Sequence, residues 1–344
     1  MKVVYGHTDS IFVQIDSIER AKEVIKEIEM EVREHFPNIL DLPTHPISLE
    51  FEKYYSALGV GTTKNRNAGT IVWKDGKNLD KPEFTMTGFV AKRVSATPLE
   101  KEVQTKILKM WVEGNSFTEI NSYLHSIYKA ILDNNVDFRK LIKRSRINES
   151  RFMVRCDSCN RKYSLKDLTK MRVCGENEGR DGTHKCGEPV SKFKTLENKR
   201  PSISSGVVGV ISAWQNNQNM TFDDSYLYMK VNTKETYINP LTKQERIADY
   251  VAGNLEKEFE KYKPDTLHYA EQVVKKAKPI YLAMGWDLLA IKTGKKTKKP
   301  NRLVVNKYEY RRKIQSKFST NERIYISMEY GKCRRPFKTY FEDY

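Results

Sequence analysis

Four of the five cysteines lie close together, and their spacing suits a structural metal site. Cys156 and Cys159 are separated by two residues, so two thiolates can bind one ion from a single tight turn. Cys174 and Cys186 follow, and the eleven residues between them include several Gly, Glu and Asp, a composition that allows a loop. These four residues predict a structural Zn²⁺ site, with His184 as the alternative to Cys186 for the fourth ligand. The competing interpretation is four free, buried thiols.

A second candidate site lies near the N-terminus, in the segment Tyr5-Gly6-His7-Thr8-Asp9-Ser10. The segment separates two short β-prone runs, Lys2–Tyr5 and Ile11–Gln14, which predicts a hairpin with a polar tip. A carboxylate at such a tip is exposed, yet the strands behind it fix its position. The segment taken alone is also compatible with a polar turn that happens to contain Asp9.

This hexapeptide resembles the Tyr-Gly-Asp-Thr-Asp-Ser signature of family B DNA polymerases, which forms a hairpin in the palm domain. The resemblance implies that Asp9 binds Mg²⁺ in a two-metal site, which stabilises the attacking 3′-oxygen and the leaving pyrophosphate. It also implies that Tyr5 and Thr8 lie near the nucleic acid. His7 departs from the signature, and a neutral imidazole is a poorer Mg²⁺ ligand than a carboxylate. His7 therefore implies lower activity, an altered metal preference or a degenerate enzyme.

A second resemblance follows in Ser48–Tyr55, which is similar to the family's Leu-Glu-x-Glu-Lys palm strand. We expect a strand over Ile47–Tyr55, in which alternation places Glu50 and Glu52 on one face. The resemblance implies that Glu52 lies near the metals and assists catalysis. For Glu50, a solvent-facing position on the strand is the simpler expectation.

Basic residues continue the resemblance in the family's order. Lys64 and Arg66 lie where the family has a Lys-Lys-x-Tyr-Ala-Gly motif that contacts the primer–template, although Asn65 and Asn67 replace its second Lys and its Tyr. Lys92 and Arg93 match a motif that leads from palm to thumb and implies contact with primer phosphates.

A further basic stretch, Lys143, Arg144 and Arg146, resembles the part of the thumb that follows duplex phosphates. A solvated helix face is the alternative for this stretch. The expected ligands of all these residues are a DNA primer–template and a deoxynucleoside triphosphate.

The elements that must position these residues indicate an α+β fold. Periodicity predicts an amphipathic helix over 17–36, strands over Ala68–Trp73 and Phe84–Phe89, and a turn at Lys74–Lys77. Later segments are helical in pattern: 98–113, 117–134, 244–262 and 266–288. Together with the resemblance, this predicts part of a polymerase palm, with an antiparallel sheet and a helix, followed by a mainly helical thumb with an insertion like a zinc ribbon.

The expected domain organisation has five parts. They are the C-terminal half of the palm (1–92), a first part of the thumb (93–149), the zinc-binding insertion (150–198), a second part of the thumb (199–290) and a basic C-terminal extension (291–344). The extension holds 16 Lys or Arg and 5 Asp or Glu, interleaved with nine Tyr or Phe. Basic and aromatic residues in alternation are typical of nucleic-acid surfaces.

Composition agrees with a polyanionic partner. The 344 residues include 61 Lys and Arg against 44 Asp and Glu, a net charge of +17. No segment resembles a membrane span or a signal peptide, so we expect a cytoplasmic, nucleoid-associated protein without a membrane partner. The C-terminus has no clear clamp-binding peptide, which neither supports nor argues against a sliding clamp.

The sequence lacks two motifs that a complete family B polymerase needs. Motif A supplies a second metal-binding aspartate, motif B grips the incoming nucleotide, and neither occurs here; nor does an exonuclease domain. We therefore expect a larger partner chain with exonuclease, fingers and motif A, as in the split polymerases of some archaea. Met1 just before the hairpin favours a natural gene start over a truncated piece. The rival interpretation is an inactive polymerase remnant that binds DNA.

Overall fold

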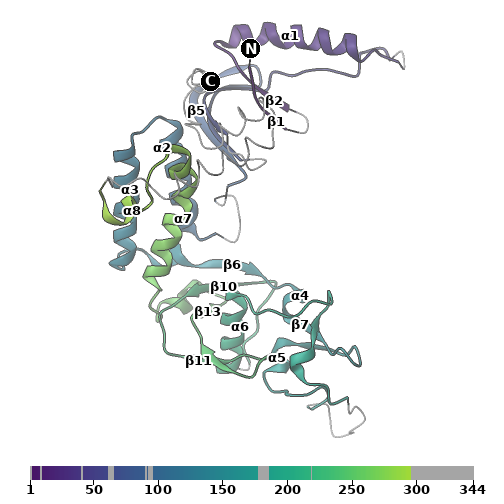
Figure 1. Ribbon diagram of the computed structural model, residues 1–344, viewed down its shortest axis with the longest axis vertical. Coiled ribbons are helices and arrows are strands. Elements are labelled where there is room, and N and C mark those ends of the chain that lie inside the picture. The colour runs from purple at the N-terminus through teal and green to yellow at the C-terminus, as the bar shows by residue number, and fades with distance from the viewer. Residues whose placement is uncertain are drawn as a thin grey trace, which may run out of the picture. The chain divides into compact units, whose positions relative to one another are not determined.

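The protein is described by a computed structural model, in which residues 2–7, 10–39, 42–60, 66–89, 91, 96–176, 186–217 and 219–295 are placed. The chain forms two compact units, which are described separately below. Unit 1 comprises residues 1–92, 103–125 and 274–344, and unit 2 comprises 93–102 and 126–273. Figure 1 shows the elements. No helix in the described ranges is both long and apolar enough to cross a membrane.

Unit 1 contains a hairpin, a helix and a three-stranded antiparallel sheet. The hairpin consists of β1 (Lys2–His7) and β2 (Ser10–Gln14), and the sheet has the order β3-β4-β5, with β3 Lys53–Val60, β4 Asn67–Lys74 and β5 Lys77–Thr87. Asp75 and Gly76 form the two-residue turn between β4 and β5, with φ of 49° and 85°. The predicted turn is confirmed, because Asp and Gly tolerate the positive φ that such a turn demands.

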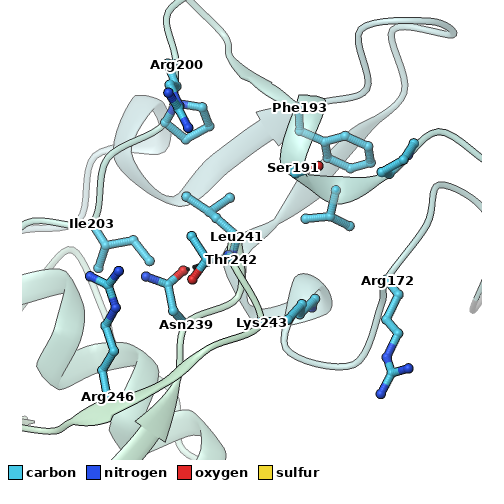
Figure 2. Close-up of a pocket in the computed structure, with 13 residues that line it drawn as sticks. Arg172, Ser191, Phe193, Arg200, Ile203, Asn239, Leu241, Thr242, Lys243 and Arg246 are labelled. Carbon is cyan, nitrogen blue, oxygen red and sulfur yellow. Dashed lines mark hydrogen bonds between the residues drawn. The ribbon is translucent and has the colours of Figure 1, made fainter.

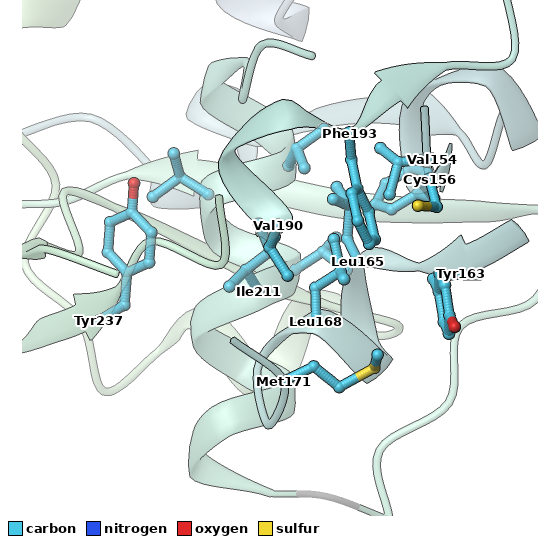
Figure 3. Close-up of a cluster of buried hydrophobic side chains, with 14 of the residues drawn as sticks. Val154, Cys156, Tyr163, Leu165, Leu168, Met171, Val190, Phe193, Ile211 and Tyr237 are labelled. Carbon is cyan, nitrogen blue, oxygen red and sulfur yellow. The ribbon is translucent and has the colours of Figure 1, made fainter. Parts of the chain in front are cut away.

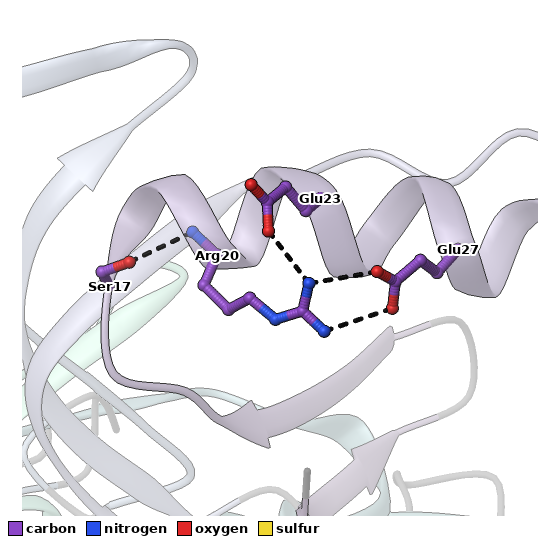
Figure 4. A network of polar contacts seen from close by, with 4 residues as sticks. All are labelled: Ser17, Arg20, Glu23 and Glu27. Carbon is purple, nitrogen blue, oxygen red and sulfur yellow. Dashed lines mark hydrogen bonds and ion pairs between the residues drawn. The ribbon is translucent and has the colours of Figure 1, made fainter.

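Helix α1 (Ile18–His35) begins where the sequence predicts it. Ser17 is the N-cap, and its hydroxyl accepts a hydrogen bond of 3.1 Å from the backbone N–H of Arg20. The Arg20 guanidinium forms ion pairs with Glu23 at 2.9 Å and Glu27 at 3.0 Å along the exposed face (Figure 4). Such exposed pairs contribute little individually. The helix is fixed in the unit by its apolar face, where Ala21 and Val24 are buried.

Three helices have residues in both units: α2 (Pro98–Val112), α3 (Phe117–Leu132) and α7 (Thr266–Met284). The first two confirm the predicted helices at 98–113 and 117–134. Helix α2 begins with a capping box in which Thr97 Oγ1 accepts from the Glu100 N–H at 3.0 Å, and Glu100 Oε2 accepts from the Thr97 N–H at 3.2 Å. Helix α7 ends at Met284, and Gly285, with a φ of 67°, lets the Trp286 N–H reach the Tyr281 carbonyl at 2.8 Å.

Unit 1 is completed by helical residues from distant parts of the sequence. Helix α8 (Leu289–Thr293) lies close to α3. Buried Asn121 accepts a hydrogen bond from the Tyr281 hydroxyl at 2.8 Å and donates one to the Ala290 carbonyl at 3.1 Å. These contacts satisfy a buried amide that would otherwise cost free energy.

Unit 2 contains three small antiparallel sheets. The first has the order β13-β10-β6, the second pairs β11 with β12, and the third has the order β8-β7-β9. The strands are β6 (Lys143–Arg146), β7 (Met153–Arg155), β8 (Lys162–Ser164), β9 (Lys194–Thr195), β10 (Ser225–Lys230), β11 (Thr236–Ile238), β12 (Glu245–Ile247) and β13 (Tyr250–Gly253). The short helices are α4 (Glu149–Phe152), α5 (Leu165–Leu168) and the 3₁₀ turns Phe138–Leu141, Val190–Lys192 and Glu256–Phe259.

Helix α6 (Ser205–Asn216) covers the first of these sheets and contacts β13 and β10 (Figure 1). Two glycines allow the close approach: a Cβ on Gly209 would lie 2.8 Å from the Val251 backbone, and a Cβ on Gly206 would lie 2.6 Å from the Tyr226 hydroxyl. The core continues from α6 into the cysteine segment, where Phe193 is buried near Leu165 (Figure 3).

Two expectations about elements are wrong. The predicted strand Ile47–Tyr55 begins at Lys53, because Ile47 and Leu49 bond to α1 instead of a neighbouring strand: the Arg33 side chain donates to the Ile47 carbonyl at 3.0 Å, and the Leu49 N–H donates to Glu29 at 3.0 Å.

The predicted helix over 244–262 is also absent. The structure has β12, β13 and a 3₁₀ turn there, because Tyr250–Gly253 pairs with β10 and buries Val251. The helix is predicted from charged residues at helical spacing. The segment forms a strand instead, because it pairs with β10, which lies about 20 residues earlier in the chain.

Candidate functional site

The N-terminal hairpin has the geometry that the sequence predicts. His7 pairs with Ser10, and Lys2 pairs with Gln14, so that two residues, Thr8 and Asp9, connect the strands. The pairing runs two residues further toward the tip than expected, and the register shifts between Val3 and Tyr5. Thr8 and Asp9 lie outside the described residues, while Tyr5 and His7 belong to β1.

Glu52 lies immediately before β3 and not within it. Its side chain is 60% exposed, and its carboxylate forms an ion pair of 2.6 Å with Lys53. This pair raises the pKa of the Lys53 ammonium through the hydrogen bond to Glu52. Glu50 is exposed as well, whereas Phe51 between them is half-buried. Glu50 and Glu52 are therefore both exposed on either side of Phe51, as the predicted alternation requires. In the described part of the chain, however, they precede β3 and belong to no strand.

The segment that carries Glu52 is held by its neighbours. The Phe51 ring stacks on Trp73 of β4 with centroids 4.1 Å apart, and the Asp75 N–H donates to the Glu52 carbonyl at 3.2 Å. Tyr54 donates from its hydroxyl to the Ile15 carbonyl at 3.2 Å, which ties β3 to the chain that leaves the hairpin. Backbone and ring contacts thus fix the position of Glu52 while its carboxylate faces solvent.

In unit 2 the cysteines converge on one point. Cys156 follows β7, and the turn after it is closed by the Asn160 N–H donating to the Cys156 carbonyl at 3.0 Å. Asn160 has a φ of 58°, which makes this turn tight enough to bring Cys159 beside Cys156. The segments that carry Cys174 and Cys186 are joined by backbone hydrogen bonds: the Gly187 N–H donates to the Cys174 carbonyl at 3.2 Å, and the Cys174 N–H donates to the Glu188 carbonyl at 2.9 Å.

The four sulfur atoms have a spacing that fits a metal ion. All lie within 4.8 Å of one another; Cys156 and Cys186 are 3.6 Å apart, and Cys159 and Cys174 are 3.5 Å apart. Around a tetrahedral Zn²⁺ with Zn–S bonds of about 2.3 Å, sulfurs are separated by about 3.8 Å. The structure therefore brings Cys186 into the cluster with the other three cysteines. The alternative ligand, His184, lies outside the described residues.

Burial acts against the thiolate form of these cysteines. It raises the pKa of Cys174 to about 12, although the Tyr163 hydroxyl, 3.2 Å from the sulfur, opposes this rise. It also raises the pKa of Cys156, against the hydrogen bonds from the N–H groups of Cys159 and Ser158. A bound divalent cation would reverse the balance, because a coordinating thiol is deprotonated outright. Binding of a metal ion would therefore convert these buried thiols into thiolates, whereas contact with solvent would not.

Comparison with known proteins assigns the chain to a family. The family model described as "DNA polymerase family B" matches residues 1–282 of the 344. The chain belongs to family B of the DNA polymerases. The chain is similar to the DNA polymerase zeta catalytic subunit of Arabidopsis thaliana (27% identical over 141 residues) and to DNA polymerase 2 of Aeropyrum pernix (28% over 142 residues).

The matches cover a small part of each relative. They span 41% of this chain but 7% of the Arabidopsis protein and 15% of the Aeropyrum protein. The structure of the family B DNA polymerase from the hyperthermophilic archaeon Pyrobaculum calidifontis aligns with 80% of this chain and 26% of that chain, at a TM-score of 0.41 and 16% identity.

The basic residues that the sequence predicts to contact DNA lie in different settings. Arg66 is half-buried just before β4, while Lys64, Lys92 and Arg93 lie outside the described residues. Lys143, Arg144 and Arg146 belong to strand β6, so the alternative of a solvated helix face is wrong. Alternation along this edge strand exposes Arg144 and Arg146.

Lys143 faces the other way and pairs with buried Glu100 at 3.4 Å. This ion pair lies within unit 2, and it balances the charge of Lys143. Arg144 and Arg146 are exposed and therefore accessible to a polyanion.

Sequence reasoning missed the residues that support the cysteines. Tyr163 contacts Cys174 and stacks on Phe193 with centroids 5.6 Å apart. Ser158, within the turn between Cys156 and Cys159, donates to Glu188 at 2.6 Å and so links this turn to the segment that follows Cys186. Neither contact has a signal in the sequence, because it depends on segments that approach one another only in the folded chain.

Proposed function

We propose that this chain is the small subunit of a split family B DNA polymerase, active together with a larger chain that supplies motifs A and B. The observation that carries the proposal is the family match over residues 1–282 in a sequence that lacks both of those motifs. A single metal-binding hairpin cannot complete a two-metal site. The proposal therefore requires a second chain with the other aspartate.

In this proposal the palm segment supplies carboxylates and the following region holds DNA. Asp9 would bind Mg²⁺, which supplies charge neutralisation of the transferring phosphoryl group, and Glu52 would assist from its fixed segment. Lys64, Arg66, Lys92, Arg93, Arg144 and Arg146 would contact phosphates of the primer–template. The pairing of His7 with Ser10 supports the predicted hairpin, on which this role for Asp9 depends.

The four cysteines would hold one structural Zn²⁺. Their sulfur spacing supports the assignment, and a closed four-thiolate set leaves no open position for catalysis. The ion would fasten the sheet β8-β7-β9 to the segments that carry Cys174 and Cys186. Palm, thumb and ribbon-like insertion remain proposed names for the parts of the chain, with the five domain boundaries predicted above.

The second candidate function is a DNA-binding remnant without catalysis. Two observations favour it: His7 stands where the family has an aspartate, and the Glu52 carboxylate is paired with Lys53. A remnant would keep the basic residues and bind DNA equally well whatever residue occupied position 9.

Primer extension with the candidate large chain separates the two functions. We expect extension with Mg²⁺ or Mn²⁺ that requires both chains, and a loss of about a hundredfold or more in Asp9→Asn, since a lost metal ligand removes several kcal/mol of stabilisation. The matched control is Asp16→Asn, an aspartate just after β2. DNA binding without extension in either metal would establish the remnant instead.

A further inference from the structure

Two adjoining cavities in unit 2 are lined by basic residues. The larger, of about 530 Å³, is lined by Arg172, Arg200, Lys243 and Arg246 and by no acidic residue (Figure 2). The smaller, of about 150 Å³, shares Arg200, Pro201 and Leu241 with it and adds Arg151, Lys199 and one acidic residue, Glu197, which pairs with Lys199 at 2.7 Å. We call the two together the cationic groove. Its lining residues include none of the four clustered cysteines.

A rigid turn presents one side of the groove. Asn239, which is 6% exposed, accepts hydrogen bonds through Oδ1 from the N–H groups of Leu241 at 2.9 Å and Thr242 at 3.1 Å. Figure 2 shows the Asn239 amide nitrogen on the side of Arg246. Asn239 and Arg246 both line the larger cavity, so an amide and a guanidinium are available there as donors, a combination that suits phosphate oxygens.

The protein balances the charge of the groove in part, through the pair of Lys199 with Glu197 and through Glu176 near the larger cavity. Lys243 is half-buried, with a φ of 60°, and its ammonium donates to the Leu168 carbonyl. Burial lowers the pKa of Lys243, which reflects the cost of a charge that has lost water. Glu176 acts on Arg172 and Lys243 electrostatically, but its carboxylate accepts backbone N–H groups of Arg172 and Val173.

Arg200 and Arg246 are two of the cations that line the larger cavity. Among the described residues, no carboxylate lies within 4.0 Å of either guanidinium. Arg246 extends toward Asn239 and Ile203, whereas Arg172 points away from them (Figure 2). Both arginines line the larger cavity, and in the described ranges neither has an anionic partner, so an external anion would neutralise charge that the protein leaves unpaired.

We propose that the cationic groove binds the sugar–phosphate backbone of a single nucleic-acid strand. The inference rests on the proposed DNA-binding function and adds a site outside the palm hairpin. Two adjoining cavities that share Arg200 suit successive phosphates better than one free phosphate. Phe193 is 1% exposed, so its ring offers no surface for base stacking, and the binding is independent of sequence.

Salt dependence of DNA binding tests the groove. The probe is a fluorescently labelled oligothymidylate, titrated with the full chain in a series of salt concentrations and followed by anisotropy. Each phosphate contact on single strands contributes about 0.7 to the slope of log K against log salt. We expect Arg200→Gln and Arg246→Gln each to reduce the slope by about that amount and to weaken binding several-fold at low salt.

The matched control is Lys257→Gln, which removes one exposed charge of unit 2 that lines neither cavity. Equal slopes for Lys257→Gln, Arg200→Gln and Arg246→Gln, with all variants folded by thermal melting, would overturn the proposal. So would arginine-dependent binding of inorganic phosphate or polyglutamate in place of the oligonucleotide. If the wild-type chain binds no DNA at all, the proposed function fails; if it binds DNA with unchanged variants, the groove alone fails.

Discussion

Glu52 shows how a single side chain can be positioned by its backbone and still be free to change partners. Phe51 and the Asp75 N–H fix the chain on either side, yet the carboxylate is 60% exposed and pairs with Lys53. An exposed pair of this kind is worth little, so a metal ion could displace Lys53 at small cost.

We therefore predict that Glu52→Gln lowers primer extension about tenfold, equivalent to about 1.4 kcal/mol, when the chain acts with its partner. Glu50→Gln is the matched control, because Glu50 is exposed on the same extended segment. Rates would be measured at saturating primer–template. Equal rates in the two variants would remove Glu52 from the proposed metal site.

At the scale of elements, the sheet of unit 1 packs against α2 through a glycine. A Cβ on Gly59 of β3 would lie 2.5 Å from the Trp111 ring, which is itself 5% exposed. We predict that Gly59→Ala lowers the free energy of unfolding by about 1–3 kcal/mol, because a buried indole has little room to move. Urea denaturation followed by tryptophan fluorescence measures the change.

Gly6→Ala serves as the control for this substitution, since a Cβ at Gly6 meets no atom within 4 Å. If both variants unfold at the same urea concentration, the close approach of β3 to Trp111 does not limit stability.

The cysteine element makes a prediction about metal. We expect one Zn²⁺ per chain by elemental analysis, and loss of that ion in Cys156→Ser and Cys174→Ser. Its removal by a chelator should increase amide hydrogen exchange in β7 and β8, because the ion holds segments that are 30 residues apart at Cys156 and Cys186. Cys333→Ser, outside the described residues, should retain the metal. Zinc-free protein with unchanged exchange would contradict the assignment.

The elements that could be predicted from the sequence were those with local causes. The hairpin at residues 2–14, the Asp75-Gly76 turn and α1 with its Ser17 cap follow from turn chemistry, capping and periodicity, and each is confirmed. Strands β10 and β13 depend on pairing between distant segments, and the charged sequence around residue 244 has a helical pattern instead.

The candidate sites divide in the same way. The spacing of Cys156 and Cys159 predicts a metal-binding turn, and the structure brings Cys174 and Cys186 to contact distance from it. Arg200 and Arg246 come from segments about 45 residues apart, and periodicity and motif give no sign that they line one cavity. Local sequence patterns do not show which distant segments come together in the folded chain.

On the scale of the whole molecule, charge should govern how the protein meets DNA. The net charge is +17, and residues 291–344 carry 16 Lys or Arg against 5 Asp or Glu. We predict that a chain ending at Lys295 binds duplex DNA more weakly and with a smaller salt slope, by about 0.9 for each phosphate that the shortened chain no longer neutralises. Anisotropy with a labelled duplex measures both. An unchanged slope would mean that the basic extension does not contact DNA.

The division of the chain into units has a consequence for its synthesis. Unit 2 ends at Val273, so all of it has been translated before the ribosome reaches Tyr281 and Ala290. Asn121 of unit 1, synthesised some 160 residues earlier, must wait for those two residues to complete its hydrogen bonds. Unit 2 can therefore complete its contacts during synthesis before unit 1 can. In the interval, the unfinished core around Asn121 is exposed, and a holding chaperone would protect it from aggregation.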